Sequence, residues 1–251
     1  MDVKERDGFI TRWREYFGDA ELPLAVFFSD KRAPKAATTV RSGPCVISML
    51  HLVREGKTLC LSADSRMCRG AKKYLGFVPE VGMQDFEYFL AHGIPGKLEG
   101  ERYKKTPELV RESMKISPSF RAPKRFIVFK RWDKLEESDE PEIVVFIAGL
   151  DTIAGLFTLA NFDEAEPNRV ICPFGSGCSS IVFYPYVEML SVNPRCIIGM
   201  FDISARLWVG ENALSFAAPY PKFQRMVANM DESFLTTDSW RVLLKDRRVR
   251  S

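Results

Sequence analysis

The sequence predicts a mixed α/β fold, with a mixed α+β arrangement as the alternative, built as a single domain over residues 1–251. Apolar runs of strand length alternate along the chain with segments that have a helical period or helix-start signals. This alternation favours helices layered on a sheet with at least one parallel pair of strands. With 251 residues, of which 46% are apolar, the chain is long enough to bury a substantial core.

The N-terminal region predicts one helix and one strand. Its first stretch is amphipathic, with Val3, Ile10, Trp13 and Phe17 on one side, which is typical of a surface helix and not of a signal peptide. The run "LPLAVFFSD" (22–30) has the length and apolar content of a buried strand. A polar loop that contains proline follows it.

The next segments predict a helix, a strand and a short second helix. The first helix is expected to begin near Pro44, to run through "CVISMLHLVREG" and to stop at Gly56. The run "KTLCLSA" predicts a strand. The stretch "DSRMCRGAKKYLG" then predicts a short helix with Cys68 at or near its start and Gly76 at its end.

The middle of the chain predicts an inserted helical connection over residues 78–124, which mix glycine, proline and charged residues. Two helices are expected in it, "MQDFEYFLAHG" and "TPELVRESMK", the second opened by a Thr-Pro pair. The runs "KRFIVFKRW" and "EIVVFIAGL" then predict two strands joined by an acidic linker.

The C-terminal half continues the same alternation. The segment "DTIAGLFTLANF" predicts a helix capped by Asp151, and "NRVICP" predicts a strand. The stretch "GSGCSSIVFYPYVE" reads as a glycine turn, a cysteine where a helix should begin, and an aromatic helix or loop. Residues 194–235 form a C-terminal extension, with strands "RCIIGMF" and "NALSFAAP" and the helix "YPKFQRMVANM".

Two parts of the chain, residues 20–77 and 142–190, share one order of elements: strand, helix, strand, and a helix that a cysteine starts. The segments "CRGAKKY" and "CSSIVFY" both place a tyrosine six positions after the cysteine. This order suggests an internal pseudo-duplication. If the two halves face one another, Cys68 and Cys178 are expected to converge.

Several of these segments together resemble the ArCR-like domain-of-unknown-function family of archaeal and bacterial proteins. The resemblance lies in "GPCVISMLHLVREGKTL", "CRGAKKYLGF", "DTIAGLFTLANF", "GSGCSSIVFYPYVE" and "GMFDISAR", continuing to "ALSFAAPYPKFQRMV". It extends from about Leu22 to Met230. It implies one soluble prokaryotic domain of unassigned activity, with cysteine-bearing motifs at Cys45, Cys68 and Cys178 whose role it leaves open.

Composition and charge argue against two classes of partner, nucleic acids and membranes. A formal net charge of +3 gives no broad basic surface, and neither a helix-turn-helix nor an aromatic-basic stripe is present, so no nucleic-acid partner is expected. The longest apolar runs fall short of the roughly 20 residues that span a bilayer, so no membrane partner is expected. We therefore expect a cytoplasmic protein whose six cysteines are thiols or ligands, not disulfides.

The cysteines supply the sharpest chemical hypothesis. A cysteine at a helix start faces unpaired N–H groups and the positive end of the helix dipole, which favour the thiolate. Cys68 and Cys178 both have this expected position, and Cys178 is the candidate catalytic residue. Gly175 and Gly177 would let backbone amides approach an anion. The structural alternative is that the glycines form a tight turn and the cysteines are small packed residues.

Charged residues in expected loops add candidate ligand contacts. Arg66 flanks Cys68, and Arg41 and Arg206 lie near other turns, where they could clamp a carboxylate or phosphate. Asp202 and Arg206 are four positions apart, a spacing that is typical of an ordinary ion pair on a helix. The sequence contains neither a P-loop nor a dinucleotide-binding glycine pattern.

Three function classes remain open. The preferred one is a small-molecule- or cofactor-binding protein, enzymatic or not, with a cleft lined by Cys68, Cys178, Gly175, Gly177, Arg66 and Arg206. The first alternative is a metal or iron-sulfur protein that uses Cys45, Cys68 and Cys178, with zinc or an iron-sulfur cluster as cofactor. Against it, the sequence has no CxxC pair. The second alternative is a thiol-dependent enzyme, which the supply of only two histidines, His51 and His92, weakens. The ligand's identity and the oligomeric state are left open.

Overall fold

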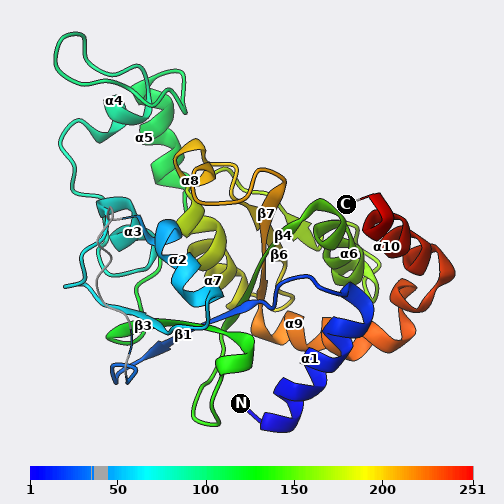
Figure 1. The fold of residues 1–251 in the computed structure, drawn as a ribbon. Coiled ribbons are helices and arrows are strands. Elements are labelled where there is room, and N and C mark those ends of the chain that lie inside the picture. The colour runs from blue at the N-terminus through cyan, green and yellow to red at the C-terminus, as the bar shows by residue number, and fades with distance from the viewer. Residues whose placement is uncertain (35, 37–44, 251) are drawn as a thin grey trace.

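A seven-stranded mixed sheet forms the centre of the structure, in the order β2-β3-β1-β4-β7-β6-β5 (Figure 1). The computed structural model describes residues 1–34, 36 and 45–250. The strands are β1 (Leu24–Ser29), β2 (Leu59–Leu61), β3 (Phe126–Arg131), β4 (Ile143–Gly149), β5 (Val170–Ile171), β6 (Cys196–Gly199) and β7 (Ala213–Pro219). Neighbouring strands are antiparallel except for the β5–β6 pair, so the expected parallel pairing is present at one edge.

The strands are apolar on both faces, because helices cover both sides of the sheet. In β1, Leu24, Val26 and Phe28 contribute to one buried cluster, while Ala25 and Phe27 contribute to the other. This division follows from the two-residue period of a strand. The protein therefore has two cores, one on each face, and the helices determine what each core contains.

The face of the sheet that contains the first core is covered by helices, most of which follow a cysteine in the sequence. These are α2 (Val46–Arg54), α3 (Arg69–Tyr74), α7 (Tyr184–Met189) and α8 (Ile203–Arg206). The opposite face is covered by α1 (Val3–Phe17), α6 (Leu150–Asn161), α9 (Tyr220–Asn229) and α10 (Asp238–Arg250). In the part of the chain that the structure describes, no helix combines the length and the apolar content needed to cross a bilayer.

The expected inserted connection, residues 78–124, contains α4 (Phe86–Leu90) and α5 (Pro107–Ile116). These two helices pack on each other and project from the body of the domain near α8, and we call residues 78–124 the arm (Figure 1). Thr106 caps α5 as the sequence predicts, because its side chain accepts from the N–H of Leu109. The hydroxyl of Tyr103 donates to Asp202 at 3.0 Å, which fastens the arm to the body.

Most predicted elements are present, and the differences are local. The N-cap of α6 is Gly149, and Asp151 lies inside the first turn instead of capping the helix. Helices α8 and α10 were not predicted. The expected helix start at Pro44 lies outside the described residues. In the described part of the chain, the first helical residue of α2 is Val46.

The suggested pseudo-duplication is not shown. One strand, β3, separates β1 from β2, whereas two strands, β7 and β6, separate β4 from β5. The helix of the first half, α2, packs on one face of the sheet, while its expected counterpart, α6, packs on the other. The two parts therefore share an order of elements along the chain without sharing an arrangement in space.

Candidate functional site

Cys178 lies at the start of a continuous helical segment, residues 177–189. The central residues of this segment, Ser179–Phe183, form a π-helix, a rare conformation that is frequent at functional sites. The cysteine is only 6% exposed and belongs to the first core. It is packed because neighbouring helices come very close: a Cβ at Gly177 would lie 2.8 Å from Cγ1 of Ile47.

Cys68 is the N-cap residue of α3, as the sequence predicts. Its Sγ accepts a hydrogen bond from the N–H of Ala71 at 3.3 Å. The residue is exposed, whereas Ala71 is buried in the first core. Cys68 therefore lies at the boundary between that core and solvent.

Cys45 is the N-cap residue of α2, but its side chain makes no capping hydrogen bond. It is partly buried and packs against the same core that contains Cys178. Three cysteines thus stand at the starts of three helices on one face of the sheet. We call Cys45, Cys68 and Cys178 the thiol site.

The pKa values of Cys68 and Cys178 are both raised, and burial is the largest cause in each case. Burial raises the pKa of Cys178 well above its ordinary value, and negative charge on Cys68, Cys45 and Asp202 raises it further. Loss of surrounding water raises the pKa of Cys68, although part of that residue is exposed. The N–H of Ala71 opposes this rise, and charge on Cys45 adds to it. Cys178 thus lies in the first core and Cys45 packs against it, while Cys68 caps a helix whose Ala71 is part of that core.

The expectation that a helix start would favour the thiolate is wrong for Cys68 and Cys178. Both pKa values are raised chiefly by desolvation, which at Cys68 outweighs the opposing backbone N–H groups. At neutral pH these two sulfurs are thiols. This weakens the hypothesis that Cys178 is an activated nucleophile, since the thiolate is the reactive form.

The other predicted contacts are distributed differently. Gly175 and Gly177 do not have the positive φ of an anion-binding nest. They permit close packing instead: a Cβ at Gly175 would lie 2.4 Å from Oγ of Ser179. Arg66 is exposed beside the thiol site. Arg41 lies outside the described residues.

Arg206 serves the loop between α8 and β7. Its guanidinium donates to the carbonyls of Ala213 at 2.5 Å, Glu211 at 2.5 Å and Gly210 at 3.2 Å. The expected ion pair with Asp202 does not form, because both side chains have other partners. This arrangement assigns Arg206 a structural contact in place of a ligand clamp.

Asp202 is the residue of this region that the sequence analysis undervalued. Its carboxylate is 8% exposed and accepts from the N–H of Gly177 at 3.3 Å, from the hydroxyl of Tyr103 and from Ser204. Burial and the bond to Asp202 raise the pKa of Tyr103 to about 12. An available signal was the Asp-x-Ser spacing in "FDIS", which is typical of an N-cap.

The remaining cysteines and the histidines lie elsewhere. Cys60 and Cys196 are buried in the second core, across the sheet, and Cys172 is exposed. His51 lines a different pocket, and His92 is in the arm, where its ring contacts the carbonyl of Gly93. Among the residues described, no three His, Cys, Asp or Glu side chains already stand in the geometry of metal ligands.

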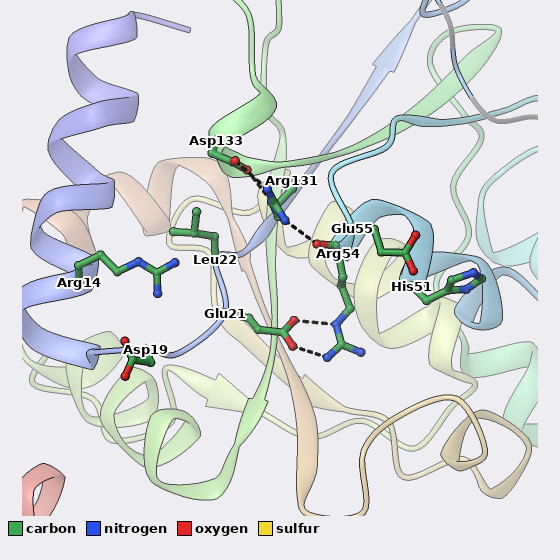
Figure 2. A pocket seen from close by; sticks show the side chains of 9 residues that line it. All are labelled: Arg14, Asp19, Glu21, Leu22, His51, Arg54, Glu55, Arg131 and Asp133. Atoms are coloured by element: carbon green, nitrogen blue, oxygen red, sulfur yellow. Dashed lines mark hydrogen bonds and ion pairs between the residues drawn. The ribbon is translucent and has the colours of Figure 1, made fainter. Parts of the chain in front are cut away.

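A polar pocket of about 540 Å³ opens between the end of α1, the end of α2 and β3 (Figure 2). Arg54 makes a two-point ion pair with Glu21, and Arg131 makes another with Asp133. Arg131 also donates to the carbonyl of Arg54 at 2.7 Å. The third arginine, Arg14, donates to two backbone carbonyls. The chain's own acceptors thus already engage the three guanidinium groups, and no predicted site residue lines this pocket.

The comparisons with known proteins extend the family resemblance and add no activity. No curated protein and no solved structure matches this chain. A model of the DUF169 family, described as uncharacterised ArCR, matches residues 14–229. The matched range contains the whole sheet and the three cysteines of the thiol site. The chain therefore belongs to the DUF169 family of uncharacterised ArCR proteins.

Proposed function

We propose that this protein binds a small molecule or cofactor at the thiol site. The observation that supports the proposal is that Cys45, Cys68 and Cys178 stand at the starts of three helices that cover one face of the sheet. Their graded exposure, from buried Cys178 to exposed Cys68, would let a ligand approach from solvent and reach the core.

The backbone around the thiol site supports the proposal. Met200 has a φ of 69°, a left-handed conformation that is uncommon for a residue with a side chain, and Met200 is buried. The π-helix Ser179–Phe183 lies in the same region. Strained backbone and π-helices cluster at functional sites. Two such features beside Cys178 therefore favour a binding role over packing.

Tyrosines supply amphipathic contacts for a ligand. Tyr74 packs edge-on against Phe183 at 5.6 Å between ring centroids. Burial raises its pKa, and the nearby Tyr184, Cys178 and Asp202 add to that rise, so Tyr74 lies within electrostatic range of the site. A neutral thiol and a neutral phenol both donate hydrogen bonds. The site is thus suited to a ligand with polar acceptors and an apolar body.

The thiol-dependent enzyme is the weaker hypothesis. The pKa values of Cys68 and Cys178 are shifted so as to favour the neutral thiol, and neither histidine lies at the site. A thiol nucleophile needs a lowered pKa or an adjacent base. We therefore propose binding as the primary function, with any chemistry supplied by the bound molecule.

The test is a ligand screen on the reduced, metal-free full chain by thermal shift. We expect a ligand that raises the melting temperature of the wild type and of Cys172→Ser, but not of Cys68→Ser. Cys172 is a matched control, because it is an exposed cysteine outside the thiol site. Amide NMR shifts at Ala71 and Gly177 would locate the ligand.

A second control separates the thiol site from the polar pocket. Arg54→Ala opens the ion pair with Glu21 without touching the cysteines. If the ligand's effect is lost in Arg54→Ala and kept in Cys68→Ser, the ligand binds in the pocket of Figure 2 and the proposal fails.

A further inference from the structure

We propose that a second copy of this chain binds to an apolar surface beside the arm, so that two copies form a dimer with two-fold symmetry. The surface consists of five large exposed side chains, which we call the α8 patch: Phe174, Phe201, Ile203, Leu207 and Trp208. The proposal uses none of the cysteines and is independent of the proposed function.

The first part of the α8 patch surrounds the junction between α8 and the arm (Figure 1). Phe201 and Ile203 flank Asp202, whose carboxylate accepts from the hydroxyl of Tyr103. The ring of Tyr103 also packs edge-on against the ring of Phe174, at 6.1 Å between the centroids. One tyrosine of the arm therefore contacts both segments that contribute to the patch.

The rest of the α8 patch continues this surface past the end of the helix. Leu207 keeps a right-handed helical backbone, and the N–H of Trp208 donates to the carbonyl of Ala205. Leu207 therefore lies on the same side as Ile203, four positions before it. Leu207 is 83% exposed and Ile203 is 69% exposed, so the described residues leave both side chains largely uncovered.

The size of the α8 patch fits an interface between two proteins. Its three aromatic side chains are between 46% and 59% exposed. With the two aliphatic side chains, the patch presents on the order of 500 Å² of apolar surface. Single exposed apolar residues are ordinary, whereas a continuous patch of this size marks an interaction site. Two copies face to face would cover about 1,000 Å², the lower bound of a specific interface before the polar rim is counted.

The charged residues within this stretch leave the centre of the α8 patch apolar. Asp202 is buried among its donors. The guanidinium group of Arg206 donates to three backbone carbonyls of the loop that follows α8. The centre of the patch therefore has no unpaired charge for an ionic partner. Interfaces between identical subunits have centres of this kind, which are more apolar than the rest of the protein surface.

Opposite charges at the two ends of the α8 patch favour a second copy as the partner. At the arm end, residues 101–105 carry three basic side chains and one acidic one, and Nζ of Lys104 lies 5.2 Å from the ring centroid of Phe174. At the other end Glu211 is exposed, and the described residues give neither Glu211 nor the exposed Lys105 an ion pair. A two-fold axis through the patch would bring Lys105 of each copy towards Glu211 of the other.

The first test measures the oligomeric state of the reduced full chain by sedimentation equilibrium over a range of concentrations. We expect a monomer–dimer equilibrium for the wild type. Leu207→Glu should raise the dissociation constant of the dimer by roughly 30-fold or more, because it places a charge at the centre of the interface. Since Leu207 is exposed, this variant should keep its fold, which an unchanged far-UV circular dichroism spectrum would verify.

Phe157→Glu is the matched control. Phe157 is another exposed apolar residue, but it lies in α6, on the opposite face of the sheet. This variant should have the dissociation constant of the wild type. If Phe157→Glu dissociates the dimer and Leu207→Glu does not, the interface lies at α6 and the inference fails.

The second test examines the two-fold arrangement at low ionic strength, where exposed charges are least screened. Lys105→Glu and Glu211→Lys should each weaken the dimer, because each places like charges opposite one another at both ends of the interface. A mixture of the two variants should restore dimers, since both contacts of a mixed dimer join opposite charges. Dimers that neither variant weakens, or a mixture that stays monomeric, would overturn the two-fold arrangement.

Three further results overturn the inference. One is a wild type that stays monomeric at the highest concentration measured, and another is a dimer that Leu207→Glu leaves unchanged. The third is a monomer that binds vesicles of phosphatidylcholine and phosphatidylglycerol in a Leu207-dependent way, which would assign the α8 patch to a lipid surface. Because Leu207→Glu leaves Cys68 in place, ligand binding by this variant tests the proposed function separately.

Discussion

The backbone N–H of Gly177 donates to Oδ2 of Asp202 at 3.3 Å, although 25 positions separate the two residues. The same carboxylate accepts from Ser204 at the start of α8 and from Tyr103 in the arm. Asp202 therefore joins three segments of the chain: the helical segment that carries Cys178, helix α8 and the arm. This junction holds the start of the 177–189 segment in place beside the thiol site.

The first prediction concerns the charge of this junction. Asp202→Asn should lower the free energy of unfolding by about 1–3 kcal/mol. The reason is that the amide nitrogen of Asn cannot accept the hydrogen bonds that the Asp202 carboxylate now accepts. Urea denaturation measures the loss. Asp19→Asn, at an exposed position, is the control and should change stability by less than about 0.5 kcal/mol. Equal stability of Asp202→Asn and the wild type would contradict this role.

The second prediction tests the close packing before Cys178. A Cβ at Gly177 would lie 2.8 Å from Ile47 and 3.0 Å from Ala205, so Gly177→Ala should destabilise the protein by about 1–3 kcal/mol. Gly70→Ala is the matched control, since Gly70 lies in α3 with nothing within 4 Å of its Cβ position. That variant should gain roughly 0.5–1 kcal/mol from helix propensity. A loss of stability of similar size in both variants would refute the packing argument.

The third prediction is the order in which the cysteines react. In the metal-free native protein at neutral pH, iodoacetamide should label Cys68 and Cys172 first, while the buried Cys60, Cys178 and Cys196 stay protected. The rate at Cys68 should rise about tenfold per pH unit, because its raised pKa keeps it in the thiol form. Peptide mass spectrometry follows each site. Fastest labelling at Cys178 would restore the hypothesis that it is a nucleophile.

The fourth prediction is a pH dependence of stability at Glu142. Burial raises the pKa of this carboxyl, although Oε2 accepts from the N–H of Phe28 at 2.6 Å. A raised folded-state pKa means that protonation favours the folded protein. The contribution is present below the unfolded-state pKa of about 4.3 and is lost as pH rises through the folded-state value.

Glu142→Gln keeps an acceptor for Phe28 and carries no charge. Its stability relative to the wild type should therefore increase between pH 4 and pH 7, as measured by urea denaturation at both values. Glu137→Gln, at an exposed position, should show no such trend. A difference that is constant across this range would mean that the charge of Glu142 does not oppose folding.

Local patterns predicted the elements that have strong local signals. The apolar run of β1 and the helical period that ends at Phe17 are readable because burial imposes a period of two or of 3.6 on the sequence. The Thr-Pro start of α5 is readable because capping is a contact within one helical turn. Helix α8 has only four residues, and α10 joins the second core through Trp240, so neither has a clear period of its own.

The features of the candidate site also fall into two groups, those that local sequence patterns predict and those that depend on tertiary packing. The sequence predicted that Cys68 starts a helix, and its Sγ indeed accepts from Ala71. It did not predict the direction of the pKa shift, because desolvation depends on atoms from distant segments. Ile47 and Ala205, which close the space around Gly177, lie 130 positions before it and 28 positions after it in the numbering of the chain. No local pattern reports how tightly they pack.

By itself, the sequence determined the alternation of strands and helices, the family and the presence of a cysteine at the start of two helices. The tertiary structure decided that Cys45 packs against the core that contains Cys178, that Asp202 links the segment of Cys178 to α8 and the arm, and that Cys178 is buried. The physical reason is the distance over which each interaction acts. Helical period and capping act over a few residues, whereas burial and the interaction between charges depend on distances in space that the order of the chain does not fix.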